Sequence, residues 1–170
     1  IKYTVGKFAY GYFGLGDLFV FVFFGLISVL GSNFLFDSIL EFKLINPAIV
    51  LGLLSVGVLN LNNMRDIKND ADCGKKTLAV LLGAHKAKIY HFTLVSFAVV
   101  LICHFQYELN ISSSYLNLFL ILNSLGLLIH LIEVYKVSSP IVYNKYLKVL
   151  ALHAFLFSFL ISLYFFKIVI

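Results

Sequence analysis

The sequence predicts an all-α membrane protein, a multi-pass bundle of five transmembrane helices. Of its 170 residues 61% are hydrophobic and 12% are charged, and the mean hydropathy is +0.98. A soluble domain carries about 25% charged residues. The apolar residues lie in long uncharged runs, and runs of about 18 residues or more predict helices that span a membrane. Because these runs are continuously apolar rather than alternating, membrane strands are disfavoured.

Each of five runs predicts one span. Their approximate bounds are 17–36, 47–63, 89–107, 115–133 and 149–166. The second run is short before its polar end, so we expect its helix to continue into the charged stretch that follows. No linker, low-complexity tract or short repeat divides residues 1–170, which we therefore expect to form part of one domain.

The basic residues predict the orientation of the spans. Eleven of the 13 lie on one side, at the N-terminus and after the second and fourth spans, and only Lys43 and Lys167 lie on the other. The positive-inside rule places the first side in the cytoplasm. We expect a multi-pass protein of the cell (inner) membrane. Because its basic residues flank membrane helices, the net charge of +5 does not indicate nucleic-acid binding.

One stretch, NLNNMRDIKNDADCGKKTLAVLLG, gathers charge between two apolar runs. If the second span stays helical, each residue turns by about 100°, and Asn63, Asp66 and Asp70 fall on one face. Asp72 falls on the opposite face. Two carboxylates on adjacent turns repel unless something neutralises them, and oxygen ligands suit Mg²⁺, which shares its shell with water and substrate phosphates. The alternative is a solvated helix end.

Four basic residues close to these acids could bind phosphate: Arg65, Lys68, Lys75 and Lys76. Gly74 can end the helix in a left-handed conformation, and Thr77 can cap the short helix that follows. This turn would hold the two lysines near the carboxylates. There they could take up charge that builds on a leaving group.

A second polar cluster lies near the start of the chain. Tyr3 and Lys7 are four residues apart and would share a helix face, on the same side of the membrane as the charged stretch. Such a pair can donate hydrogen bonds to phosphate, although an interfacial tyrosine with a snorkelling lysine is the simpler interpretation. Asp17 directly precedes the first span and fits an N-cap.

Two segments resemble motifs of the UbiA superfamily of intramembrane prenyltransferases. YTVGK…YGYFGLGDLFVFVFFG contains the superfamily's YxxxK pattern at Tyr3 and Lys7, and LNNMRDIKNDADCGKKTLAVLLG is similar to its second aspartate-rich motif. Both look most like the branch that prenylates 1,4-dihydroxy-2-naphthoate in menaquinone biosynthesis. The resemblance spans about Tyr3–Gly83, and the remainder matches only as further helices.

The resemblance implies nine transmembrane helices around a cavity where two aspartate-rich motifs hold Mg²⁺ and a polyprenyl diphosphate. The allylic diphosphate ionises, the aromatic acid attacks the carbocation, and loss of the acceptor's carboxylate gives demethylmenaquinone. The implied catalytic residues are Asp66, Asp70, Tyr3 and Lys7, of which Asp66 and Asp70 bind the metal. The implied diphosphate contacts are Lys75, Arg65, Lys76 and Asn63.

The first aspartate-rich motif, of the NDxxD type, has no counterpart in this sequence. The only candidate, Asp37 with Glu41, falls in a loop that the topology places on the other side. With five spans instead of nine and no starting Met, we expect the C-terminal piece of a longer protein. We expect it to be inactive without its missing N-terminal helices.

Two alternatives remain open. The acceptor could be another aromatic acid, such as 4-hydroxybenzoate, or the chain could be part of a membrane transporter. A transporter should carry charged or helix-breaking residues in mid-span, and these spans lack charges.

Polar residues inside the spans predict packing or hydrogen-bonding roles. The five histidines show no metal-ligand spacing, and His104 and His130 are expected to face the bundle interior. Asn117 and Asn123 are expected to form hydrogen bonds between helices.

Overall fold

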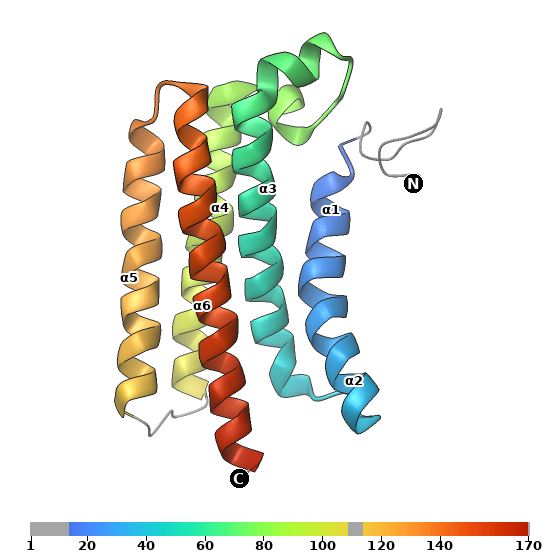
Figure 1. Cartoon of the computed structure of the whole chain (residues 1–170), viewed down its shortest axis with the longest axis vertical. Helices are drawn as coiled ribbons and strands as arrows, with labels where there is room; N and C mark the ends of the chain where they lie inside the picture. Colours follow the sequence, from blue (N-terminus) through green and yellow to red (C-terminus); the bar gives the residue numbers. More distant parts are fainter. Residues whose placement is uncertain (1–13, 109–113, 170) are drawn as a thin grey trace.

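The computed structural model describes residues 14–108 and 114–169. Five helical segments in it are long and apolar enough to cross a membrane, and they run side by side as a bundle (Figure 1). These described ranges contain no strand. The predicted all-α multi-pass bundle is therefore confirmed.

The elements follow the predicted order of spans. They are α1 (Gly16–Val20), the π-helical η2 (Phe21–Gly31), α2 (Ser32–Asp37), η3 (Phe42–Leu44), α3 (Ile45–Asp72), α4 (Leu78–Glu108), α5 (Ser114–Lys136), η4 (Pro140–Val142) and α6 (Tyr143–Val169). The first three form one span, 16–36, which ends where Ser38 turns into the left-handed conformation (φ 55°). The short η3 and η4 lead into α3 and α6.

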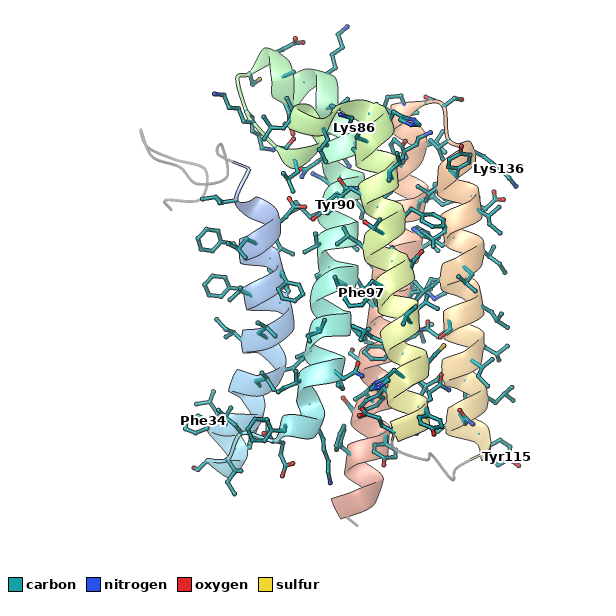
Figure 2. All side chains as sticks on the ribbon, turned by 180° about the vertical axis from the view of Figure 1, so that it is seen from behind. Phe34, Lys86, Tyr90, Phe97, Tyr115 and Lys136 are labelled. Carbon is teal, nitrogen blue, oxygen red and sulfur yellow. The ribbon has the colours of Figure 1, made fainter. Side chains whose placement is uncertain are left out.

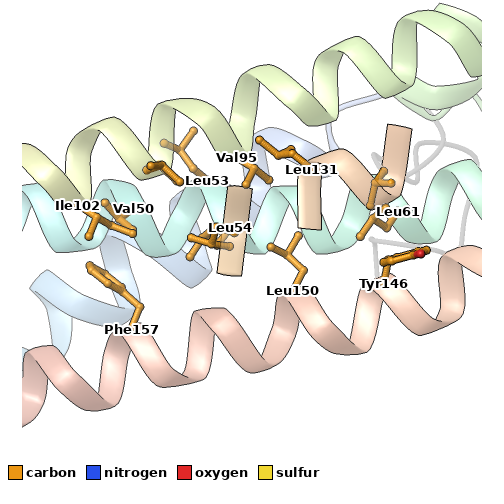
Figure 3. Close-up of a cluster of buried hydrophobic side chains, with 14 of the residues drawn as sticks. Val50, Leu53, Leu54, Leu61, Val95, Ile102, Leu131, Tyr146, Leu150 and Phe157 are labelled. Carbon is orange, nitrogen blue, oxygen red and sulfur yellow. The ribbon is translucent and has the colours of Figure 1, made fainter. Parts of the chain in front are cut away.

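Helix α3 is the centre of the bundle. It contacts η2, α4 and α6, while α5 packs against α4 and α6 (Figure 1). Half of its most apolar stretch is buried, against 6% for the first span. Figure 3 shows Val50 of α3 near Phe157 of α6, and Leu61 of α3 near Tyr146 of α6. A helix surrounded in this way needs apolar residues on all its faces.

Glycines bring the first span against α3. A Cβ on Gly25 would lie 2.7 Å from both the carbonyl oxygen of Ala48 and the Cα of Gly52. A Cβ on Gly52 would lie 2.8 Å from the ring of Phe21. Small residues at facing positions let two membrane helices approach closely. This contact sets the position of the first span in the bundle.

Helix bounds differ from the predicted spans where polar residues begin. Helix α3 continues through Asp72, as expected, and α6 begins at Tyr143 rather than at 149. Helix α4 begins at Leu78 rather than at 89, with a break at Gly83 (φ 77°, ψ 161°). The uncharged runs stop at the first lysine, whereas a helix can continue beyond the apolar layer of the membrane.

The connections alternate between the two ends of the bundle, as the predicted topology requires. The α3–α4 and α5–α6 connections lie at one end, and the α2–α3 connection lies at the other (Figure 1). Lys86 and Lys136 mark the first end, and Phe34 and Tyr115 mark the second (Figure 2). Asp37 is the last residue of α2, so the Asp37–Glu41 segment lies at the end opposite the charged stretch.

Both predicted asparagine contacts are present. Gln106 of α4 donates to Asn117 Oδ1 of α5 at 2.6 Å, and Asn123 Oδ1 of α5 lies 2.7 Å from His153 Nδ1 of α6. These hydrogen bonds join helices inside the apolar layer, where a polar group without a partner is costly.

The histidines give a mixed outcome. His130 is buried, as expected, and its Nε2 lies 3.1 Å from Nε2 of His91 on α4. His104 does not face the interior, since its side chain is 56% exposed and lies 3.5 Å from Glu108. Its expected hydrogen-bonding role is confirmed, because its Nδ1 lies 3.4 Å from Nδ2 of Asn46 on α3. The His91–His130 contact was not predicted, because it joins two helices 39 residues apart along the chain.

Candidate functional site

The charged end of α3 presents the predicted polar face. Because the helix runs unbroken to Asp72, Asn63, Asp66 and Asp70 lie on one side of it. Asn63 and Asp70 are buried, with 3% and 6% of their surface exposed, and Asp66 is partly buried. Asp72, on the opposite face, is exposed.

A tight turn brings Lys75 back to Asp70. Its Nζ lies 3.2 Å and 3.1 Å from the two carboxylate oxygens. The backbone N–H of Lys75 donates to the carbonyl of Asp70 at 2.8 Å, and that of Gly74 donates to Ala71 at 3.0 Å. These are the two hydrogen bonds of a Schellman motif, in which the glycine takes a left-handed conformation; here its φ is 70°. The predicted turn is confirmed for Lys75.

Replacing Gly74 should test how this turn holds Lys75. A Cβ at Gly74 would meet nothing within 4 Å, so the cost of Gly74→Ala is conformational, about 1–2 kcal/mol. We expect lower stability of the protein in detergent, measured as its free energy of unfolding. Gly74→Asn is the matched control, since asparagine tolerates this conformation. Equal effects of the two substitutions would show that backbone conformation is not the cause.

Arg65 neutralises the other carboxylate. Its Nε donates to Asp66 Oδ1 at 2.8 Å, and one terminal nitrogen donates to Asp66 Oδ2 at 2.5 Å. The guanidinium also donates to Asn62 on α3 at 2.7 Å and to Asn144 on α6 at 2.6 Å. Arg65 therefore ties α3 to the start of α6 as well as balancing the charge of Asp66.

The other predicted phosphate-binding residues are not brought together in the same way. Lys68 and Lys76 are exposed, and neither takes part in an ion pair among the described residues. Tyr3 and Lys7 lie outside the described residues. Thr77 does cap the next helix, since its Oγ1 accepts from the backbone N–H of Val80 at 3.3 Å.

The residues present fit part of a magnesium site. Within the described part of the chain, no three His, Cys, Asp or Glu side chains are close enough to hold a metal ion. Asn63, Asp66 and Asp70 nevertheless supply oxygen donors, the type that Mg²⁺ prefers, and this ion usually completes its shell with water and substrate phosphates.

Asp17 corrects one expectation and introduces a residue that the sequence did not indicate. It is not an N-cap: Leu15 precedes α1, and no side chain caps that helix. Asp17 is instead buried, and the Tyr90 hydroxyl of α4 donates to its Oδ2 at 3.1 Å. Tyr90 lies in an apolar run, where a single tyrosine carries no functional signal.

Comparison with known proteins places this geometry in context. The model of the UbiA prenyltransferase family matches residues 1–149. A 1,4-dihydroxy-2-naphthoate octaprenyltransferase of Haemophilus influenzae is 42% identical over 163 residues, 96% of this chain and 52% of that protein. The Escherichia coli protein of the same name is 49% identical over 106 residues, 62% of this chain and 34% of that protein.

A eukaryotic relative extends the comparison. UbiA prenyltransferase domain-containing protein 1 of Dictyostelium discoideum is 38% identical over 126 residues, 72% of this chain and 36% of that protein. No solved structure matches the chain. The chain spans about half the length of the Haemophilus relative and about a third of the other two. Since the family model covers most of its length, this chain belongs to the UbiA prenyltransferase family.

Proposed function

We propose that this chain forms part of a membrane enzyme that transfers a polyprenyl group from polyprenyl diphosphate to 1,4-dihydroxy-2-naphthoate. The acceptor loses its carboxylate, and the product is demethylmenaquinol, the reduced form of demethylmenaquinone. The names of the bacterial relatives support this acceptor. Because the chain belongs to a prenyltransferase family, we favour an enzyme over a membrane transporter.

The observation that carries the proposal is the polar face of α3 with the turn that follows it. This end of the bundle places two carboxylates, a buried amide and a lysine next to one another, and Lys75 already contacts Asp70. Cations balance both carboxylates, so an incoming diphosphate would meet positive groups as well as metal ligands. That combination suits a diphosphate better than it suits a neutral or cationic ligand.

Asp66 and Asp70 would hold Mg²⁺, with Asn63 beside them. When bound, the ion supplies positive charge for the departing diphosphate. Lys75 would move its hydrogen bonds from Asp70 to phosphate oxygens and stabilise the charge that develops there. Arg65 would keep Asp66 oriented while it ties α3 to α6. Tyr3, Lys7 and Lys76 would add contacts to the diphosphate.

Part of the proposed site lies outside this chain. We propose that the remaining metal ligands come from helices that precede this sequence in a longer protein. The 170-residue chain alone should then be inactive. The enzyme would lie in the cell (inner) membrane, with the charged end of the bundle in the cytoplasm, because that end carries most of the basic residues.

The proposed function can be tested by measuring prenyl transfer to different aromatic acceptors with the full-length protein. In vesicles with polyprenyl diphosphate and Mg²⁺, we expect prenyl transfer to 1,4-dihydroxy-2-naphthoate, giving demethylmenaquinol, at least about 100-fold faster than prenyl transfer to 4-hydroxybenzoate. A buried polar site discriminates this strongly between ligands with different hydrogen-bonding groups. Faster prenyl transfer to 4-hydroxybenzoate would show that the acceptor is not the naphthoate. Prenyl transfer by the 170-residue chain alone would contradict the proposal that part of the site lies outside this chain.

A further inference from the structure

Asp17 is a buried carboxylate that the proposed metal and diphosphate site does not use. It lies in the first membrane-spanning segment with 6% of its surface exposed. In the described part of the chain it has no ion pair, and its side chain accepts a hydrogen bond from the Tyr90 hydroxyl. A carboxylate inside a membrane span is costly and commonly marks a functional site.

Asp17 lies beside the charged end of the bundle. Three residues before it, a Cβ on Gly14 would lie 3.3 Å from the carbonyl oxygen of Lys76. Lys76 follows Lys75, whose side chain pairs with Asp70. Helix α1 also contacts α3, and Figure 2 shows Tyr90 farther into the bundle than Lys86. The Asp17–Tyr90 pair is therefore next to the proposed diphosphate site, on its membrane side.

A second hydrogen-bond acceptor lies in the same layer. Asn60 of α3 is fully buried, and its Nδ2 donates to the carbonyl of Ala87 at 3.0 Å. Ala87 is one helical turn before Tyr90, and residues three apart lie on the same side of a helix. Asn60 Oδ1 has no hydrogen-bond partner among the described residues. Because buried polar atoms are normally paired, this oxygen can accept a hydrogen bond from a ligand that reaches it.

The charge of Asp17 selects between the two substrates. With no ion-pair partner among the residues that the structure describes, the carboxylate would repel a diphosphate. Tyr90 occupies one of about four positions at which a carboxylate accepts hydrogen bonds. A hydroxyl of an aromatic acceptor can occupy another, and a dihydroxy compound has a second hydroxyl that can donate to a further acceptor such as Asn60 Oδ1.

We propose, on the basis of the function proposed above, that Asp17 is a catalytic residue that binds a hydroxyl of the aromatic acceptor and takes its proton. Tyr90 is a positioning residue that holds the carboxylate toward the acceptor. The pair thus forms the acceptor side of the site, and the charged end of α3 forms the diphosphate side.

The proton and electron pairs balance in this step. As the hydroxyl proton passes to Asp17, the O–H electron pair moves into the ring. The ring carbon that carries the carboxylate, next to the hydroxyl, forms a C–C bond to the allylic carbon, whose C–O bond breaks, and diphosphate leaves with that pair. When the acceptor's carboxylate leaves as CO₂, the pair from the broken C–C bond restores the aromatic ring. The oxygen then recovers its proton from Asp17.

Kinetics of the full-length protein in vesicles test this assignment. We expect Asp17→Asn to lower kcat for 1,4-dihydroxy-2-naphthoate by about 10²-fold or more, the usual loss when a general base is removed. We expect the KM for polyprenyl diphosphate to stay within about twofold. Tyr90→Phe should lower kcat by about tenfold with the same unchanged KM. Asp72→Asn, on an exposed residue, should match the wild type.

Binding of a blocked acceptor separates catalysis from a purely structural role. The wild type should bind 1,4-dihydroxy-2-naphthoate at least about tenfold more tightly than its methyl ethers, measured as inhibition constants. Asp17→Leu should lose this discrimination. A kcat of Asp17→Asn within twofold of the wild type would overturn the proposal. The proposal would also be overturned if Asp17→Asn lost the same affinity for the naphthoate and for polyprenyl diphosphate. The Asp17–Tyr90 hydrogen bond would then only stabilise the fold.

The same measurements distinguish failure of this inference from failure of the proposed function. A wild-type protein that does not prenylate the naphthoate contradicts the proposed acceptor. A wild type that does so, with Asp17→Asn equally active, contradicts only the role of Asp17.

Discussion

Replacing Asp70 by asparagine in the full-length protein is expected to lower prenyl transfer by about 10³-fold or more. The substitution keeps the shape of the side chain and removes the charge of a proposed metal ligand that also pairs with Lys75. Loss of one strong electrostatic contact to a developing charge costs about 10²–10³-fold, and loss of metal affinity adds to it. Asp66→Asn should behave alike. The measurement is initial rate at saturating Mg²⁺ and polyprenyl diphosphate.

Asp72→Asn is the matched control for these two substitutions. It makes the same chemical change two residues after Asp70, on the exposed face of α3, and should stay within about twofold of the wild-type rate, as surface changes usually do. Unfolding in detergent should be measured for all three variants, so that a folding defect is not taken for lost chemistry. Near wild-type activity of both Asp66→Asn and Asp70→Asn would reject the metal site.

Replacing Gly25 by alanine is expected to destabilise the packing of the first span on α3. The new Cβ would lie 2.7 Å from a carbonyl oxygen and a Cα, both backbone atoms. Backbone cannot rotate away as a flexible side chain can, so the two helices must separate. Overpacking of this kind costs about 1–3 kcal/mol. The free energy of unfolding in detergent micelles measures the effect.

Gly31→Ala is the control for Gly25→Ala. Gly31 lies on the same span, and its added Cβ would meet only the Ile27 side chain, at 3.5 Å. We expect this variant to be unchanged or more stable by up to about 1 kcal/mol, because alanine favours a helix over glycine. Equal destabilisation by the two substitutions would contradict a close contact between η2 and α3.

The membrane class, the five spans and the polar face of α3 were all predictable from amino-acid order. Long uncharged runs have one stable solution in lipid, because a helix satisfies every backbone hydrogen bond internally. The 3.6-residue period places Asn63, Asp66 and Asp70 together once α3 stays helical. Gly74 signals the turn after it through its freedom to adopt positive φ. Each of these signals acts over a few residues along the chain.

Contacts between helices could not be predicted in the same way. All faces of an apolar helix look alike in sequence, so nothing indicated that Gly25 meets Gly52 or that His91 meets His130. Asp17 looked like a helix cap, and its hydrogen bond to Tyr90 joins residues 73 positions apart. Lys75 and Lys76 looked equivalent, yet the direction of one turn gives Lys75 alone an ion pair with Asp70 among the described residues.

Short-range patterns in the sequence therefore determined the class of protein and the position of its charged stretch. Only the packing of the helices determined which of the charged groups contact each other and which buried residues lie beside them. The physical reason is range: helix period, turn geometry and hydropathy depend on near neighbours. Helix neighbours in a membrane depend on small residues and polar contacts between distant segments.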